Sequence, residues 1–101
     1  MRYSTITHAK AKPFIESLDR LRRARVDRLY YLFDEYGRFL PSNYLKKIAK
    51  NLWEMRAGDV RLFLTIRGNT GYIVHGIYKK SQKIPKKDLD LAIKRVKEMN
   101  Y

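Results

Sequence analysis

The spacing of apolar residues in the N-terminal third of the chain predicts one strand followed by two helices. Residues 2–7 are rich in β-forming side chains, whereas apolar residues recur at helical intervals through residues 8–38. A break near Asp19 divides this stretch, Pro13 suits the first turn of a helix, and Gly37 suits a helix C-terminus. The clearest helical repeat is formed by Val26, Leu29, Phe33 and Tyr36.

A β-hairpin is predicted in the second half of the chain. The alternating segments Leu52–Ala57 and 60–66 flank Gly58 and Asp59. Glycine in the first place of a two-residue loop is typical of a type II′ turn, which matches the twist of the flanking strands.

This turn also fixes the register of the hairpin, because each residue before it faces one residue after it. Arg56 falls opposite Arg61, on a face that also carries Glu54, Phe63 and Thr65. The other face is apolar and is expected to contact the core. It carries Trp53, Met55, Ala57, Val60, Leu62, Leu64 and Ile66.

Three further segments complete the expected fold. Residues 44–51 are compatible with a helix or a strand, residues 72–79 alternate as a strand, and a helix is expected from Pro85 onward. On the strand, the residues expected to share a face with Arg61 are Ile73, His75, Ile77 and Lys79. On the helix, the apolar stripe consists of Leu89, Ala92, Ile93, Val96 and Met99.

The expected order is therefore β-α-α-β-β-β-α, an α+β fold with a mainly antiparallel sheet, two N-terminal helices and one C-terminal helix. The length of 101 residues fits a single domain over residues 1–101. The chain has no cysteine, no run of 18 apolar residues and no signal-peptide core. We therefore expect a cytoplasmic protein that is a monomer when free.

The net charge of the chain indicates that this small α+β domain binds a polyanion. Lys and Arg number 23 against 10 acidic residues, a formal net charge of +13 at pH 7, whereas a small domain usually carries about 2–8. Nucleic acid, an anionic membrane or an acidic protein would match this charge. We expect no membrane binding, because the apolar stripe of the last helix is needed to close the core.

The facing pair Arg56 and Arg61 is the first candidate for chemistry. Like charges directly opposite each other destabilise a sheet, unless an anion lies between them or Glu54 relieves one of them. Two guanidinium groups on a rigid sheet match a phosphate well, because each offers paired N–H donors. The alternative is that solvent screens both charges at the turn end of the hairpin.

Candidate RNA-binding lysines gather after the third predicted strand, at the start of the last helix and before the hairpin. They are Lys79, Lys80 and Lys83, then Lys86 and Lys87, then Lys46, Lys47 and Lys50. Cations at a helix N-terminus are unfavourable for the macrodipole, and a phosphate there would benefit from both the lysines and the free N–H groups. Each lysine taken singly is also compatible with an ordinary solvated surface.

Aromatic side chains and one histidine are further candidates. Tyr78, Phe63 and Tyr101 are candidates to stack on unpaired bases, and His75 is a candidate general acid or base. Each has a structural alternative as a core residue. The two histidines are far apart in the sequence and the acidic residues do not cluster with them, so we expect no metal and no other cofactor.

A basic groove without a metal limits the available reactions. Cleavage of RNA by attack of a 2′-OH on its own 3′-phosphate fits best, because RNA supplies the nucleophile and the protein need only align it, neutralise charge and move protons. Arginines and lysines are the candidates for charge neutralisation. A lysine with a pKa lowered by cationic neighbours is a candidate for the proton transfer.

The C-terminal half resembles the RelE/HigB superfamily of toxins, in particular its phage-derived HigB-like branch. That branch typically has an L-x-E-L-R…YR core, then H-G-F-x-K-K-x-Q-K-x-P and a helix with A-x-x-R. The matching positions here are residues 52–56, Val60, Arg61, His75, Gly76, Ile77, residues 79–83, Pro85, Ala92 and Arg95. Met55 and Val60 stand where the motif often has Leu and Tyr, so one stacking aromatic is absent.

The resemblance implies a toxin that cleaves mRNA on the ribosome and is neutralised by an antitoxin, in this branch usually a helix-turn-helix, HigA-like protein. The family's site residues carry over to Arg56, Arg61, Lys79 and Lys80, with Lys46 and Lys47 as further candidates. Two alternatives stay open. One is a ParE-like toxin that inhibits DNA gyrase without cleaving RNA, and the other is an RNA- or ribosome-binding module without catalysis.

Overall fold

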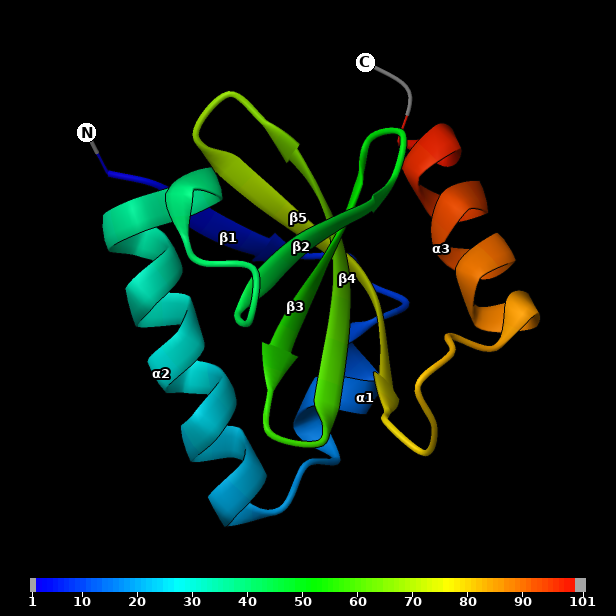
Figure 1. Ribbon diagram of the computed structural model, residues 1–101, viewed down its shortest axis with the longest axis horizontal. Helices are drawn as coiled ribbons and strands as arrows, with labels where there is room; N and C mark the ends of the chain where they lie inside the picture. The colour runs from blue at the N-terminus through cyan, green and yellow to red at the C-terminus, as the bar shows by residue number, and fades with distance from the viewer. Residues whose placement is uncertain (1, 100–101) are drawn as a thin grey trace.

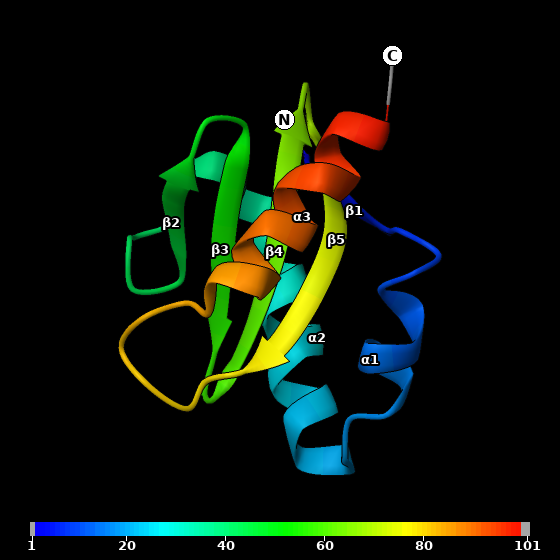
Figure 2. The same ribbon diagram turned by 90° about the vertical axis from the view of Figure 1, so that its right-hand side faces the viewer.

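The computed structural model describes residues 2–99, and within them a five-stranded sheet lies between helices on both faces (Figure 1). In chain order the elements are β1 (Ser4–Thr7), α1 (Lys12–Glu16), α2 (Arg20–Tyr36), the 3-10 helix η1 (Gly37–Phe39), β2 (Leu45–Ala49), β3 (Leu52–Ala57), β4 (Val60–Arg67), β5 (Thr70–Tyr78) and α3 (Lys86–Glu98). Figure 2 shows α3 in front of the sheet and α2 behind it.

The strands are arranged in the order β1-β5-β4-β3-β2. The β1 strand runs parallel to β5, and the other neighbouring pairs are antiparallel. The α+β class is confirmed, but the predicted order lacked one strand: β2 lies within the segment 44–51, whose pattern was ambiguous. Two consecutive exposed lysines hide the alternation there, and Leu45 is the one residue of β2 that is fully buried.

The predicted break near Asp19 and the predicted end of the second helix at Gly37 are confirmed, whereas α1 begins at Lys12 and not at residue 8. Pro13 lies in the first turn of α1, and Asp19 caps α2 by accepting a hydrogen bond from the backbone N–H of Arg22 at 3.3 Å. Gly37 ends α2 with φ +54°, and the Tyr3 ring lies so close to it that no Cβ fits.

The predicted register of the β3–β4 hairpin is also confirmed. Ala57 pairs with Val60, and Arg56 pairs with Arg61. Gly58 has φ +61°, as the first central position of a type II′ turn requires. The hairpin was predictable because the turn is short and side chains alternate with a period of two.

The register of β5 differs from the prediction at one residue. Phe63 pairs with His75, but the next residue, Leu64, pairs with Ile73. Val74 is therefore an extra residue in β5, and this bulge turns Ile73 to the opposite face of the sheet from Arg61. The prediction for Ile73 was wrong because a bulge leaves no clear signal in a short apolar strand.

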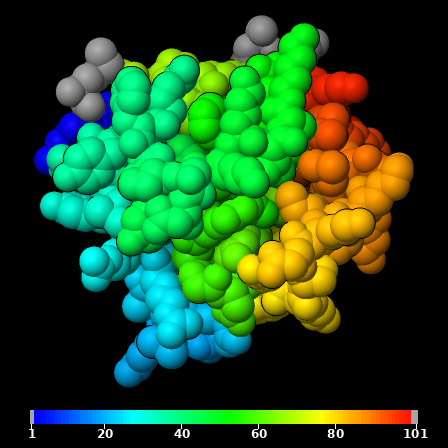
Figure 3. Space-filling view, viewed as in Figure 1, coloured from blue at the N-terminus to red at the C-terminus, as the bar shows by residue number. Residues whose placement is uncertain are grey.

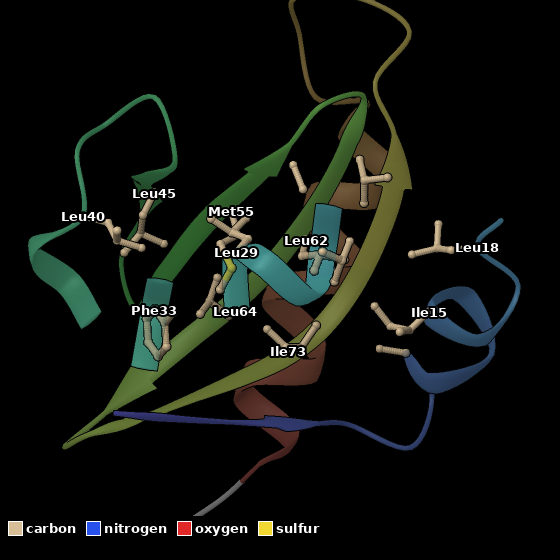
Figure 4. Close-up of a cluster of buried hydrophobic side chains, with 14 residues drawn as sticks. Ile15, Leu18, Leu29, Phe33, Leu40, Leu45, Met55, Leu62, Leu64 and Ile73 are labelled. Carbon is tan, nitrogen blue, oxygen red and sulfur yellow. The ribbon is translucent and has the colours of Figure 1, made fainter. Parts of the chain in front are cut away.

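Each face of the sheet carries a hydrophobic core, because helices cover part of each face. The cluster under α1 and α2, drawn in Figure 4, includes Ile15, Leu18, Leu29, Phe33, Leu40, Leu45, Met55, Leu62, Leu64 and Ile73. The cluster under α3 consists of Leu52, Phe63, Val74, Ala92, Val96 and Met99. Phe63 is 0% exposed, so of the two interpretations of this residue the core position is confirmed and stacking on RNA bases is wrong.

No helix formed by residues 2–99 combines the length and the apolar character that crossing a membrane would require.

Candidate functional site

A groove of about 650 Å³ opens on the Arg61 face of the sheet. Strands β2, β3 and β4 contribute side chains to it, together with the end of β5, the connector formed by residues 79–85, and the start of α3. Figure 3 shows this connector, in gold, lying against the green strands. Seven cationic side chains line the groove: Lys46, Arg56, Arg61, Lys79, Lys80, Lys83 and Lys87. Its two carboxylates are those of Glu54 and Asp88.

The facing arginines have unequal surroundings. Arg56 donates from Nε to Glu54 Oε1 at 2.8 Å, and Glu54 is 4% exposed. Arg61 Nη1 instead donates to the neutral carbonyl oxygens of Gly58 at 2.7 Å and Val60 at 3.1 Å. Within residues 2–99, no carboxylate forms an ion pair with Arg61.

Arg61 is therefore a buried cation whose charge is not neutralised by a direct partner. Burial lowers the pKa of its guanidinium, although an arginine remains protonated at any physiological pH. A phosphate in the groove would supply the missing negative charge, and the geometry thus favours an anionic ligand at this end of the hairpin.

The connector begins at a fixed position beside the hairpin turn. The backbone N–H of Lys79 donates to the carbonyl oxygen of Asp59 at 2.6 Å. The preceding ring, Tyr78, packs against Phe14 with centroids 5.2 Å apart, and the Arg22 guanidinium lies 5.3 Å from its centroid. Tyr78 is 38% exposed at the groove, so it remains a candidate for stacking on a base.

His75 is not among the residues that line the groove. Arg95 Nη1 can only donate, and it lies 3.3 Å from His75 Nδ1. The ring proton is therefore on Nε2, which donates to Asp88 Oδ1 at 2.8 Å. The ring also stacks on Phe63. His75 therefore joins β5 to α3, which is the geometry of a structural residue.

Three other predicted residues do not contribute to the groove. Lys47 alternates away from it on β2, and Lys50 lies in the β2–β3 turn beside a separate apolar hollow. Lys86 is exposed and pairs with Asp90 at 2.8 Å. Tyr101 lies outside the described residues.

Some groove residues were not singled out from the sequence. Ser81 and Gln82 lie inside the connector motif and could have been found there. Phe14 is more than 60 residues from its neighbour Tyr78, and no sequence signal joins them.

The arginines at the start of α2, outside the groove, were also not singled out from the sequence, although their concentration at a helix N-terminus is unusual.

Several solved structures share this fold. The Escherichia coli toxin RelE, as a mutant in the free state, has a TM-score of 0.70 and 16% identity, over 95% of this chain and 99% of that chain. A chain of the Mycobacterium tuberculosis toxin–antitoxin complex RelBE2 has a TM-score of 0.65 and 15% identity, over 78% and 100% of the two chains. A chain of the Pyrococcus horikoshii RelE–RelB complex has a TM-score of 0.64 and 16% identity, over 82% and 100%.

These likenesses confirm, at the level of the fold, the RelE/HigB resemblance inferred from the motifs. No curated protein matches the sequence significantly. Residues 13–97 match the family described as phage-derived protein Gp49-like (DUF891). This match spans the helices, the hairpin, the connector motif and α3. The chain therefore belongs to the phage-derived Gp49-like family.

Proposed function

We propose that this protein is the toxin of a toxin–antitoxin pair and acts as a metal-independent, HigB-like endoribonuclease that cleaves mRNA on the ribosome. One observation carries the proposal: Arg61 is a buried cation in a groove lined by seven cationic side chains, and no carboxylate pairs with it among residues 2–99. The oxygens of a phosphodiester match the paired N–H donors of guanidinium groups.

In the proposed reaction, the 2′-oxygen of one nucleotide attacks its own 3′-phosphorus. The 2′-hydroxyl gives up its proton to a water molecule, the O2′–P bond forms as the P–O5′ bond breaks, and the departing 5′-oxygen takes up a proton, which leaves a 2′,3′-cyclic phosphate and a 5′-hydroxyl. Arg61 and Arg56 neutralise the charge that develops on the phosphorane. Lys79 and Lys80 are the candidates to protonate the departing 5′-oxygen, because Glu54 and Asp88 are both engaged by other side chains.

The proposed partners are mRNA, the ribosome and a helix-turn-helix, HigA-like antitoxin. Two of the chains that share this fold come from complexes: one is titled a RelE–RelB complex and the other a toxin–antitoxin complex. Both support an antitoxin partner. The proposed location is the cytoplasm, where translated mRNA is found. The proposed free form is a monomer.

A second candidate is an RNA- or ribosome-binding module without catalysis. The engagement of both groove carboxylates, Glu54 by Arg56 and Asp88 by His75, favours it, because a nuclease also needs a proton acceptor. A binding module would lose affinity gradually as single lysines are removed, whereas an enzyme would lose rate far more than affinity on Arg61→Ala.

The test is to induce the wild type, Arg61→Ala and the exposed control Lys94→Ala in cells. Growth would be followed, and cuts in translated messages would be mapped by primer extension. The nuclease proposal requires arrest with discrete cuts in the wild type and the control, and neither in Arg61→Ala. Arrest without cuts would favour a ParE-like gyrase inhibitor. No arrest from a soluble, folded protein would favour the binding module.

A further inference from the structure

The first half of α2 carries a second concentration of positive charge, outside the groove. Five arginines lie within nine residues: Arg20, Arg22, Arg23, Arg25 and Arg28. We propose that this arginine surface binds the phosphodiester backbone of RNA as a site additional to the groove. RNA held in the groove would continue around the tip of the β3–β4 hairpin onto α2.

The placement of these arginines opposes the helix macrodipole. The first turn of α2 contains no acidic residue and the last turn contains no basic residue, whereas Asp34 and Glu35 lie near the C-terminus. Cations at a helix N-terminus are unfavourable, and arginines three or four residues apart repel each other. An arrangement that costs stability in the free chain is explained if a polyanion binds there.

Three of the five arginines remain available for a ligand. Arg22 pairs with Asp19 and Asp59, and Arg23 pairs with Asp27 at 3.2 Å. The other three form no ion pair with any residue between 2 and 99 and are exposed: Arg20, Arg25 and Arg28. At 100° per residue they fall within about 140° of the helix circumference, so one backbone could contact all three.

The arginine surface joins the groove at the hairpin tip. Arg25 packs beside Gly58 in the β3–β4 turn, where a Cβ would lie 3.3 Å from its Nη1. Arg22 reaches Asp59 in the same turn and lies over the Tyr78 ring at the groove. Figures 1 and 2 both place the start of α2, the hairpin turn and the connector at one end of the molecule. Arg61 also donates to the Gly58 carbonyl oxygen, so the groove and the arginine surface adjoin at this turn.

The composition of this surface favours RNA over an acidic protein. Protein interfaces normally bury a core of apolar and aromatic side chains. On this side of α2 the large apolar side chains that are exposed are Leu21 and, one turn beyond Arg28, Tyr31, which are too few to form such a core. Arginines without such a core are typical of contacts with phosphates, which position a nucleic acid without reading its sequence.

The experiment compares two triple variants with the same net charge. One is Arg20→Gln/Arg25→Gln/Arg28→Gln. The control removes three exposed cations away from the hairpin tip: Arg38→Gln/Lys94→Gln/Lys97→Gln. Binding would be measured by fluorescence anisotropy against 2′-O-methyl RNA, which has no nucleophilic 2′-OH, as a hairpin duplex and as a single strand. The salt concentration would be varied between about 50 and 200 mM, and circular dichroism would verify that both variants are folded.

The proposal predicts that the α2 variant loses at least ~10-fold in affinity, and that its log–log salt slope falls by about 2–3. The control should change less than ~2-fold. A larger loss on the duplex than on the single strand would identify structured RNA as the ligand, and the reverse would identify unpaired RNA; either supports the site. Equal losses in the two triples would overturn it, as would a loss of binding to an acidic partner protein with RNA affinity unchanged.

The outcome is independent of catalysis. If Arg61→Ala proves to have no effect on RNA cuts in cells, the proposed nuclease function fails, while the binding measurement with a non-cleavable RNA still decides the role of α2.

Discussion

Arg22 in the first turn of α2 binds Asp59 in the β3–β4 turn with both arms of its guanidinium, at 2.9 Å from Nε and 2.7 Å from Nη2. The carbonyl oxygen of the same Asp59 accepts the backbone N–H of Lys79. One aspartate thus joins a helix on one face of the sheet to the connector that borders the groove on the other.

The Arg22–Asp59 contact predicts a pH-dependent contribution to stability. The hydrogen bonds from Arg22 hold the pKa of Asp59 below its usual value of 3.8. A carboxylate with a depressed folded-state pKa stabilises the protein above its ordinary pKa, and this stabilisation is lost as the pH falls through the lowered value. The wild type should therefore be more stable than Asp59→Asn at about pH 6, and the two should converge at about pH 2.

Urea unfolding midpoints at several pH values would measure this difference. The effect should be small, because both side chains are more than one third exposed to solvent. A gap between wild type and Asp59→Asn that is the same at all pH values would contradict the assignment.

Glu54 should be needed for the stability of the hairpin. It is buried and pairs with Arg56, which directly faces Arg61. Glu54→Gln leaves two facing cations without a compensating negative charge. It should lower the free energy of unfolding by about 1–3 kcal/mol, and this loss is smaller than for a fully buried ion pair because Arg56 is partly exposed. Chemical denaturation would measure it. The double variant Glu54→Gln/Arg56→Gln should recover part of the loss, and no recovery would argue against the pairing.

Arg61 should require its guanidinium geometry as well as its charge. Arg61→Lys retains a cation but loses the paired donors. We expect RNA cleavage by Arg61→Lys to fall by about 10- to 100-fold, and by Arg61→Ala about 100- to 1,000-fold. Single-turnover rates on ribosome-bound mRNA would measure this, with Lys94→Ala as control. Equal activity of Arg61→Lys and the wild type would show that charge alone suffices.

His75 should act on stability rather than on proton transfer. Its Nε2 is engaged by Asp88 and its Nδ1 lies against Arg95. His75→Gln should destabilise the protein by about 1 kcal/mol, through loss of contacts between β5 and α3, and should leave the pH profile of RNA cleavage unchanged. A stable variant in which one limb of that profile disappears would instead make His75 the general acid or base.

Gly76 should be required for the contact between α1 and β5. A Cβ at this position would overlap the ring of Phe14, which packs against Tyr78 beside the groove. Gly76→Ala should cost about 1–3 kcal/mol by displacing that ring. Thermal unfolding would measure the loss, and Gly76→Ala/Phe14→Leu should restore part of it. A neutral Gly76→Ala would contradict the close packing.

Local patterns in the sequence determined the hairpin, the breaks between helices and the apolar stripe of α3. They suffice because Gly58, Asp19 and Gly37 act on the backbone within a few residues, and because side chains alternate with fixed periods. Counting residues outward from the hairpin turn placed Arg56 opposite Arg61, and the connector motif identified Lys79 and Lys80. The sequence alone therefore identified these four cationic residues of the candidate groove.

Only the tertiary structure decided which of these residues meet. The β2 strand forms because β3 offers it hydrogen bonds, although its own lysine-rich pattern is indecisive. Phe63 is buried because α3 covers it, and the bulge at Val74 turns Ile73 to the other core. Phe14 and Arg22 reach Tyr78 across more than 50 residues of chain. Such contacts depend on which faces of the sheet are covered, and a periodic pattern along one segment carries no information about that.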